Sequence, residues 1–215
     1  MVKVITQHEI AEESLDHKFP CGVFNDNSAS HELVHEIMGF FTDSPKVLDI
    51  GCAGGQFVID CNAIGCVSVG LEGSNVVSTD EKANGYLNWQ EYKNKYLFHA
   101  NATKEYSIID TKTNDLMKFD LISAWEVIEH IEENDLEMFF EQIHKHLSDS
   151  GIFIGTISVV NCYDPNNKID LHRTVKPKEW WHEYLSQKFE ICEYPFNSLL
   201  REVGYYNFSI CMRKK

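Results

Sequence analysis

From residue 46 onward, the chain alternates short apolar runs with segments in which apolar residues recur every three or four positions. Helical spacing of this kind occurs at 55–65 and, over a longer stretch, at 126–147. Apolar runs rich in β-branched residues, which are typical of buried strands, occur at 46–50, 66–72, 96–102, 119–125 and 152–160. Strands separated by helices predict right-handed crossover connections and a parallel sheet covered on both faces.

Both ends of the chain depart from this alternation. Toward the C-terminus, expected strands at 189–196 and 205–213 are separated by a short segment, which favours antiparallel pairing at the edge of the sheet. The beginning of the chain predicts helices at 7–16 and 30–41 around a loop. We therefore expect an α/β fold with a doubly wound, Rossmann-like sheet, mostly parallel with an antiparallel edge strand.

The length of 215 residues suits one compact domain rather than two. Within it we expect an N-terminal helical cap at 1–45 and a main domain at 46–215. The loop at 103–118 is long, and the sequence assigns it no role. His144 and His146 are two positions apart in an amphipathic helix, so they do not share a face, and we expect both at the surface.

Charge and composition narrow the classes of partner. The chain carries 33 Asp and Glu against 19 Lys and Arg, and a net charge of −14 repels polyanions, so nucleic-acid binding is disfavoured. No apolar run approaches 18 residues, so no membrane span is expected, and no secretory signal is visible. The seven cysteines are scattered without a CxxC pair, which favours reduced thiols and a cytoplasmic location. The oligomeric state is not readable from the sequence.

The first expected strand runs into a glycine-rich turn in the segment VLDIGCAGGQF. Small residues let a ligand approach the backbone, and the helix that follows offers free N–H groups at its N-terminus. Glu72, 21 residues after Gly51, closes the second strand, where a carboxylate accepts hydrogen bonds from ribose hydroxyls. A dinucleotide fingerprint would need a small residue at position 56, which is Gln56. We expect a nucleotide-like ligand at this turn.

The turn DIGCAGG resembles the first motif of class I S-adenosylmethionine-dependent methyltransferases, Asp-x-Gly-x-Gly-x-Gly, with Ala53 in place of the middle glycine. The resemblance extends from about Lys46 to the C-terminus, through the acid-ended strand VGLEGS and the segment EVIEHI. It implies S-adenosylmethionine as cofactor and methyl transfer as activity. Asn101 stands where most relatives carry an acid. By this resemblance, the residues around the cofactor would be Asp49, Gly51, Cys52, Ala53, Gly55, Glu72, Gly73, Ser74, Asn101, Ala102 and Trp125.

A second group of ionisable residues follows the fourth expected strand, in WEVIEHIEEND. Glu126, Glu129 and His130 have the spacing that stacks side chains on one face of a helix. His172 follows the fifth strand, so its loop opens at the same edge of the sheet. Two carboxylates and two imidazoles form a donor set for a divalent cation such as Mg²⁺ or Mn²⁺, and the imidazoles favour the transition metals.

The ExxEH pattern with a downstream histidine resembles two metal-using branches of the methyltransferases: the small-RNA 3′-end 2′-O-methyltransferases and the ubiquinone-pathway O-methyltransferases. In both, these positions hold a cation that binds the acceptor's oxygens. By this resemblance, Glu126, Glu129, His130 and His172 would be metal ligands. Two other interpretations stay open: His130 or His172 acts as a general base without a metal, beside Glu126 near the cofactor, or the group is structural.

The expected function is the transfer of a methyl group from S-adenosylmethionine to a hydroxyl of a small molecule, of the sugar or phenol kind. A hydroxyl is a poor nucleophile until a base or a metal removes its proton, and the ionisable residues supply either. Two alternatives are kept: methylation of an RNA 3′ end, and a catalytically silent S-adenosylmethionine-binding subunit of a larger complex. The sequence does not identify the acceptor.

Overall fold

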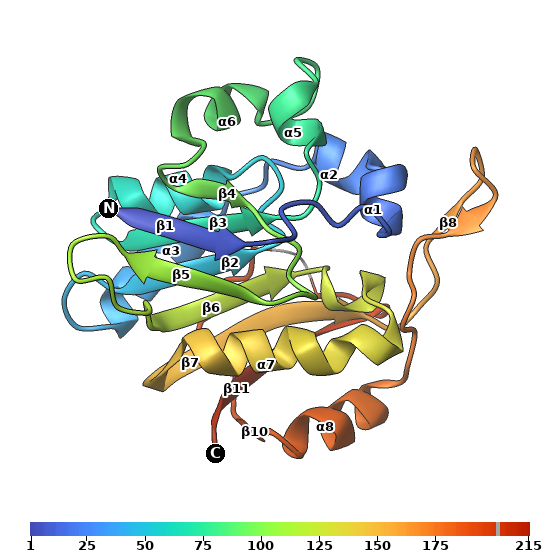
Figure 1. The fold of residues 1–215 in the computed structure, drawn as a ribbon. Helices are drawn as coiled ribbons and strands as arrows, with labels where there is room; N and C mark the ends of the chain where they lie inside the picture. Colours follow the sequence, from blue (N-terminus) through green and yellow to red (C-terminus); the bar gives the residue numbers. More distant parts are fainter. Residues whose placement is uncertain (201–202) are drawn as a thin grey trace.

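The computed structural model describes residues 1–200 and 203–215, and within them a seven-stranded sheet forms the centre of the protein (Figure 1). Its strands are β2 (Lys46–Ile50), β3 (Val67–Glu72), β4 (Leu97–His99), β6 (Phe119–Trp125), β7 (Leu147–Ser158), β10 (Phe189–Ile191) and β11 (Asn207–Lys214). They lie in the order β10-β11-β7-β6-β2-β3-β4. Strands β2, β3, β4, β6 and β7 are parallel to one another, and β11 runs antiparallel between β7 and β10. The predicted fold class is confirmed. The strand at this edge of the sheet is β10, which lies beyond the antiparallel strand β11.

Helices cover both faces of this sheet. They are α3 (His31–Phe40), α4 (Gln56–Ala63), α5 (Val76–Thr79), α6 (Tyr86–Tyr92), α7 (Leu136–His146) and α8 (Lys178–Ser186). Adjacent residues of a strand point to opposite faces, so Val47 packs in the cluster that contains α3 and α4, whereas Leu48 packs in the cluster of α7 and α8. This two-sided burial explains why the central strands read as continuous apolar runs.

The segment 126–147 is not one helix, which contradicts the prediction. Glu126 has a φ of 54°, and two short 3-10 turns, η1 (Ile128–His130) and η2 (Glu133–Asp135), precede α7. The backbone carbonyl of Glu129, which an α-helix would use internally, accepts instead from the N–H groups of Arg173 and Thr174, at 2.7 and 3.0 Å. A contact with a distant segment therefore overrides the helical pattern, and Glu126, Glu129 and His130 do not stack on one helix face.

The first residues of the chain form a strand, β1 (Val2–Thr6), which the sequence did not predict. It pairs antiparallel with β5 (Tyr106–Asp110), which lies in the loop to which the sequence assigned no role. The expected helix at 7–16 is reduced to α1 (Leu15–Lys18), and the expected loop contains α2 (Cys21–Asn25), while α3 matches its prediction. The division of the chain at residue 45 stays a prediction.

His146 is buried, which contradicts the expected surface position. Its Nε2 accepts from the N–H of Ile108, at 3.2 Å, and its Nδ1 lies 2.9 Å from the carbonyl oxygen of Gln142. Its ring stacks on Tyr106 with centroids 4.9 Å apart. Because Ile108 and Tyr106 belong to β5, the unforeseen strand is what covers this face of α7.

A small hairpin of β8 (Tyr163–Asp164) and β9 (Ile169–Asp170) projects from the body of the protein (Figure 1). The residues that follow it return to the sheet edge and include His172. The seven cysteines are free thiols. None of the described helices is long and apolar enough to cross a membrane.

Candidate active site

A cavity of about 1440 Å³ opens where the carboxyl ends of β2, β3 and β6 meet. It exceeds the roughly 300–1,000 Å³ that is typical of a site for one small ligand. The sheet ends form one side, and residues 6–17, Ile169 and residues 171–173 form others. Ligands of open α/β sheets bind in this position, and the volume leaves room for two of them.

The glycine-rich turn forms the floor at one end of the cavity. Gly51 and Ala53 line it with φ angles of 73° and 43°, both in the left-handed region that favours glycine. Gly55 does not line the cavity; it precedes α4 with a φ of 82°, and a Cβ there would meet Leu97 at 2.6 Å. The turn therefore has the backbone shape that its glycine pattern predicts, with Ala53 held in a conformation that is strained for alanine.

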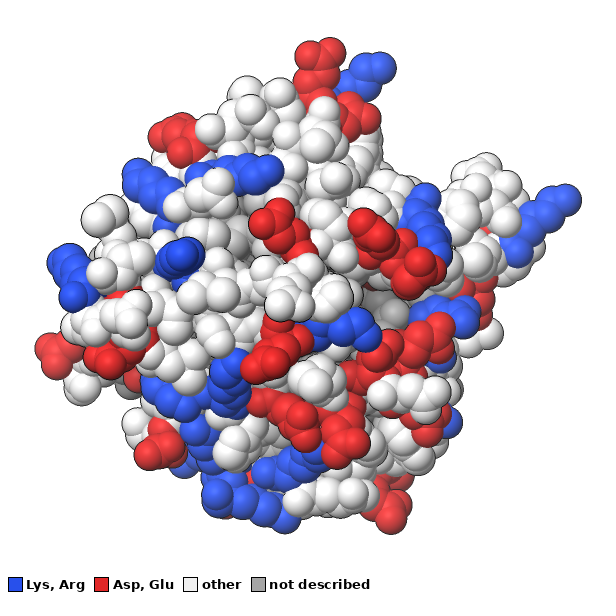
Figure 2. All heavy atoms as spheres, viewed as in Figure 1, with Lys and Arg blue, Asp and Glu red and all other residues white. Residues whose placement is uncertain are grey.

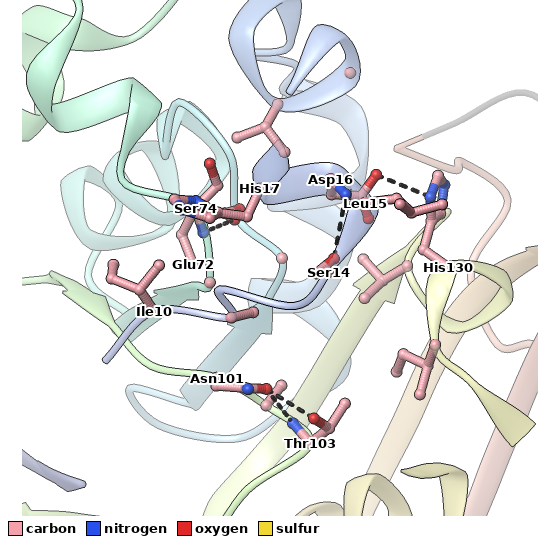
Figure 3. A pocket seen from close by; sticks show the side chains of 18 of the residues that line it. Ile10, Ser14, Leu15, Asp16, His17, Glu72, Ser74, Asn101, Thr103 and His130 are labelled. Atoms are coloured by element: carbon pink, nitrogen blue, oxygen red, sulfur yellow. Dashed lines mark hydrogen bonds and ion pairs between the residues drawn. The ribbon is translucent and has the colours of Figure 1, made fainter. Parts of the chain in front are cut away.

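Glu72 lies beside this turn with its carboxylate held in place (Figure 3). Its two oxygens accept from the backbone N–H groups of Ala53 and Ser74, at 3.0 and 2.8 Å. Burial raises the pKa of Glu72 to about 7, and these hydrogen bonds oppose the rise. Each carboxylate oxygen keeps a further lone pair, so the group can still accept from a diol. Gly73 and Ser74 also line the cavity.

The other predicted cofactor residues divide into two sets. Asn101, Ala102 and Trp125 line the cavity, and the Oδ1 of Asn101 accepts from the backbone N–H and the hydroxyl of Thr103 (Figure 3). Asp49 and Cys52 do not line it. Asp49 is buried and accepts from the hydroxyl of Ser123 at 2.7 Å; burial raises the pKa of Asp49 to about 7 and also raises that of the Cys52 thiol.

Two histidines line the opposite end of the cavity. The rings of His130 and His172 meet edge to face, with centroids 4.6 Å apart. The Nδ1 of His172 donates to the carbonyl oxygen of Val160 at 2.6 Å, and the Nδ1 of His130 lies 2.9 Å from the carboxylate of Asp16. The Nδ1 of His172 is thus hydrogen-bonded, which leaves the lone pair of its neutral ring on Nε2. The Nδ1 of His130 has the ion-pair contact with Asp16 but no aligned hydrogen-bond partner among the described residues.

The pKa values of these two histidines move in opposite directions. Burial lowers the pKa of His130, but the close contact with the Asp16 carboxylate and the charges of Glu129 and Glu126 outweigh it, so the pKa is raised. Burial, with the positive charge of a protonated His130, lowers the pKa of His172. His172 is therefore the histidine that stays neutral more readily.

Glu129, His130 and His172 form the one compact donor group found among the described residues, with a ligand atom from each within 4.8 Å of the others. Glu129 is fully buried; one carboxylate oxygen accepts from the N–H of Ser158 at 2.9 Å, and the other has no hydrogen-bond partner in residues 1–200 and 203–215. Burial raises the pKa of Glu129 to about 8. The predicted fourth member, Glu126, lines the cavity but accepts from the amide of Asn207 at 3.4 Å and is not in the group.

The sequence predicted a helix at 7–16 but no site residue in the segment 8–16, which we call the N-terminal strap. The carbonyl of His8 accepts from the N–H of Asn101 and the N–H of Ala11 donates to the carbonyl of Gly73, both at 2.8 Å. Asp16 then reaches His130 at the far end. No motif marks this segment; the only signal is that acids gather in it, at Glu9, Glu12, Glu13 and Asp16.

Comparison with known proteins identifies the family. The family model described as a methyltransferase domain matches residues 24–210. The chain belongs to this methyltransferase family. Its fold and glycine turn make it a class I S-adenosylmethionine-dependent methyltransferase, as the sequence predicted.

Among curated proteins, the methyltransferase is similar to the ubiquinone biosynthesis O-methyltransferase of Pelagibacter ubique (strain HTCC1062), with 31% identity over 114 residues. The match covers 53% of this chain and 42% of that protein, so it spans less than half of the relative.

Among solved structures, the methyltransferase resembles an S-adenosylmethionine-dependent methyltransferase of Clostridium acetobutylicum ATCC 824, with a TM-score of 0.60 and 12% identity over 93% of this chain and 96% of that one. It also resembles the glycopeptide N-methyltransferase MtfA, solved with S-adenosylmethionine, with a TM-score of 0.55 and 13% identity over 89% of this chain and 96% of that one. At these identities the likeness shows the shared fold.

Proposed function

We propose that this methyltransferase transfers the methyl group of S-adenosylmethionine to a hydroxyl oxygen of a small-molecule acceptor. The observation that carries the proposal is that one cavity joins the Glu72 end to the His130–His172 end. Methyl transfer is an in-line displacement, so a donor held at one end must present its sulfonium toward an acceptor held at the other.

The cofactor occupies the Glu72 end. The carboxylate of Glu72 is fixed by two backbone N–H groups and accepts from the ribose hydroxyls. Gly51 leaves space for the methionine part beside the turn. The complex of MtfA with S-adenosylmethionine supports this choice of cofactor.

The acceptor occupies the histidine end. A hydroxyl needs a base to take its proton as the C–O bond forms and the C–S bond breaks. His172 supplies that base, because its Nδ1 donates to Val160 and burial keeps the ring neutral, so its Nε2 lone pair is available. The proton moves from the hydroxyl oxygen to that Nε2 atom. The O-methyltransferase named above supports oxygen rather than nitrogen as the methylated atom.

The charge of the cavity favours a small acceptor over an RNA end. Nine Asp and Glu line the cavity against two Lys and Arg, Lys104 and Arg173. Figure 2 shows the same excess of red carboxylates on the right half of this face, over the segments that lead into α7. A polyanion approaching this opening would be repelled, whereas a neutral or cationic small molecule would not.

A metal-assisted variant of the same reaction rests on a separate observation. The unpartnered buried oxygen of Glu129 and the two neighbouring imidazoles form a donor set that fits a cation. One carboxylate and two imidazoles suit Mn²⁺, Fe²⁺ or Zn²⁺ better than Mg²⁺. A cation held there by Glu129, His130 and His172 would supply the acidity that a hydroxyl lacks.

A methylation screen with labelled donor tests the proposal, using sugar and phenol acceptors beside single-stranded RNA oligonucleotides. Label on a small hydroxyl acceptor is expected; label only on RNA, or only on an amine, would contradict it. Assays after chelation and after Mn²⁺ addition separate the metal-assisted reaction from the metal-free one. Calorimetric binding of S-adenosylmethionine without transfer to any acceptor would favour the silent subunit instead.

A further inference from the structure

We propose that Asp16, on the N-terminal strap, is a positioning residue that holds His130 in one tautomer, with the proton on Nδ1 and the lone pair on Nε2. The inference rests on the proposed function, since it assigns Asp16 a role at the same acceptor end. It also means that the strap contributes to both ends of the cavity: its backbone covers the cofactor end, and its Asp16 side chain belongs to the acceptor end.

The geometry of the pair is specific. The Oδ1 of Asp16 lies 2.9 Å from the Nδ1 of His130, in an ion-pair contact that is not aligned as a hydrogen bond, and the two side chains point toward one another across the edge of the cavity (Figure 3). A carboxylate this close favours a proton, rather than a lone pair, on the Nδ1 atom that faces it. The backbone N–H of Asp16 donates to the hydroxyl of Ser14, which caps α1 and sets the direction of the short helix. The carboxylate therefore reaches His130 from a defined position.

The burial of the pair separates it from an ordinary surface contact. The side chains of His130 and Asp16 are 17% and 31% exposed, whereas Lys18 and Glu13, which pair on the same segment, are 42% and 94% exposed. Exposed ion pairs contribute at most about 1 kcal/mol to stability. A partly buried carboxylate beside an imidazole instead fixes the ring and stabilises the positive charge that forms when the ring takes a proton.

The neighbouring histidine shows the same arrangement with a different partner. His172 has its Nδ1 fixed by the carbonyl oxygen of Val160, a group of the main chain next to β7. Within the described part of the chain, no main-chain carbonyl accepts from the Nδ1 of His130, and the carboxylate of Asp16 lies there instead. Histidines that bind a metal or act as bases commonly donate their second N–H to a carboxylate or carbonyl, and removing that partner typically costs 10-fold to 100-fold in activity or metal affinity.

The attachment of the strap at both ends explains why an N-terminal residue can serve this purpose. Its backbone is hydrogen-bonded to Asn101 through His8 and to Gly73 through Ala11, beside the predicted adenosine site. Asp16 lies five residues farther along, at His130. A cofactor that orders the strap at the His8 and Ala11 contacts would therefore also hold Asp16 beside the imidazole of His130.

Kinetics of Asp16→Ala and Asp16→Asn test the inference on an acceptor found by the screen. Asp16→Ala is expected to lower kcat by about 10-fold to 100-fold and to leave the Kd of S-adenosylmethionine unchanged. Asp16→Asn keeps an oxygen that can face Nδ1–H but loses the negative charge, so its kcat should lie between those of the wild type and Asp16→Ala. The control is Lys18→Gln, which breaks the exposed pair on the same helix and should behave as the wild type.

A double-mutant cycle shows whether Asp16 acts through His130. In a His130→Ala background, Asp16→Ala should have no further effect on kcat, because the ring that it positions is gone. Additive losses would overturn the inference, and so would equal losses of kcat and cofactor affinity, which would make the strap a cofactor clamp only.

A spectroscopic readout keeps the test independent of the acceptor. In ¹⁵N-histidine NMR spectra of the empty protein, with His130 assigned by its absence in His130→Gln, the neutral ring should carry its proton on Nδ1. Asp16→Ala should shift this population toward Nε2–H. An unchanged tautomer in Asp16→Ala would overturn the inference even if no hydroxyl acceptor is ever found, whereas absence of O-methylation with the tautomer shift present would contradict only the proposed function.

Discussion

The two ends of the cavity are built in different ways. At the cofactor end, Glu72 and the glycine turn belong to adjacent strands, and the carboxylate is held by N–H groups of Ala53 and Ser74. At the acceptor end, His130, His172 and Asp16 come from a 3-10 turn, the segment after β9 and the strap. The first end is assembled from local structure; the second depends on contacts between segments far apart in the sequence.

This difference predicts different responses to mutation. Substitutions at the cofactor end should change the binding of S-adenosylmethionine, because its polar groups face that ligand alone. Substitutions at the acceptor end should change turnover at nearly constant cofactor affinity, because its groups face the hydroxyl and its proton. The experiments below separate the two ends or show that they act as one.

The largest effect is expected at the acceptor histidines. His172→Ala removes the proposed base, and general-base catalysis contributes about 10²-fold to 10⁴-fold, so we expect kcat to fall by that range. Steady-state kinetics with a hydroxyl acceptor measures it, and calorimetry should show cofactor affinity preserved. The exposed His35 gives a matched control, His35→Ala, with normal kcat. Full activity in His172→Ala would return His172 to a structural role.

A smaller effect is expected at the cofactor end. Glu72→Ala removes a charged acceptor of hydrogen bonds, which contributes about 1.5–3 kcal/mol, so the Kd of S-adenosylmethionine should rise by about 10-fold to 100-fold. Isothermal calorimetry measures the change, with the exposed Glu190→Ala on β10 as control. An unchanged Kd in Glu72→Ala would break the assignment of this end to the cofactor.

The burial of Glu72 also predicts a dependence of stability on pH. Its pKa is about 7 in the folded protein and about 4.3 in an unfolded chain. Between these values the folded protein holds a proton that the unfolded chain has lost, so this contribution to stability falls as pH rises. Glu72→Gln removes the contribution.

The measurement is the melting temperature of the empty wild type and Glu72→Gln from about pH 4.5 to about pH 8. The wild type should lose on the order of 10 °C relative to the variant as pH rises to about 7, and the difference should then stay constant. A difference in melting temperature that does not vary with pH would show that folding leaves the pKa of Glu72 unchanged.

The smallest effect is expected in the turn itself. Ala53 has a φ of 43°, a conformation that costs a residue with a Cβ about 1–2 kcal/mol. Ala53→Gly relieves this cost but adds freedom to the unfolded chain, which costs about 0.4–1 kcal/mol. We therefore expect the free energy of unfolding to rise by between about 0 and about 1.6 kcal/mol. Chemical denaturation measures it, with the exposed helical Ala63→Gly as a destabilised control. A marked loss of stability in Ala53→Gly would contradict the assignment of backbone strain to Ala53.

The contrast between local and distant contacts also decides what the sequence could predict. The strand β2, the turn and Glu72 were readable because apolar runs, glycines and a strand-ending acid report on structure within a few residues. The family and fold were confirmed on this basis. The cofactor roles of these residues stay predictions.

The acceptor end was only partly readable. The residues Glu129, His130 and His172 were expected together and lie together, but the helix that was to align them is absent, because Arg173 and Thr174 take the carbonyl of Glu129. Glu126 was expected with them and lies outside the group. Asp16 was not foreseen, since its partner lies more than a hundred residues away and no local pattern marks the pair.

The two-stranded sheet of β1 and β5 was missed for the same reason. Val2 pairs with Asp110, and the alternation of half-buried and exposed positions in β1 extends over only five residues. A strand that short has no clear period, and its partner lies in a segment that reads as a loop. Distant pairing of this kind is visible only in the structure.

The most direct test of the account is a crystal structure of the protein with S-adenosylhomocysteine. We expect the ribose hydroxyls against the carboxylate of Glu72, and the sulfur directed along the cavity toward His130 and His172. A nucleoside bound elsewhere, or a sulfur that faces away from the two histidines, would contradict the claim that one cavity joins donor and acceptor.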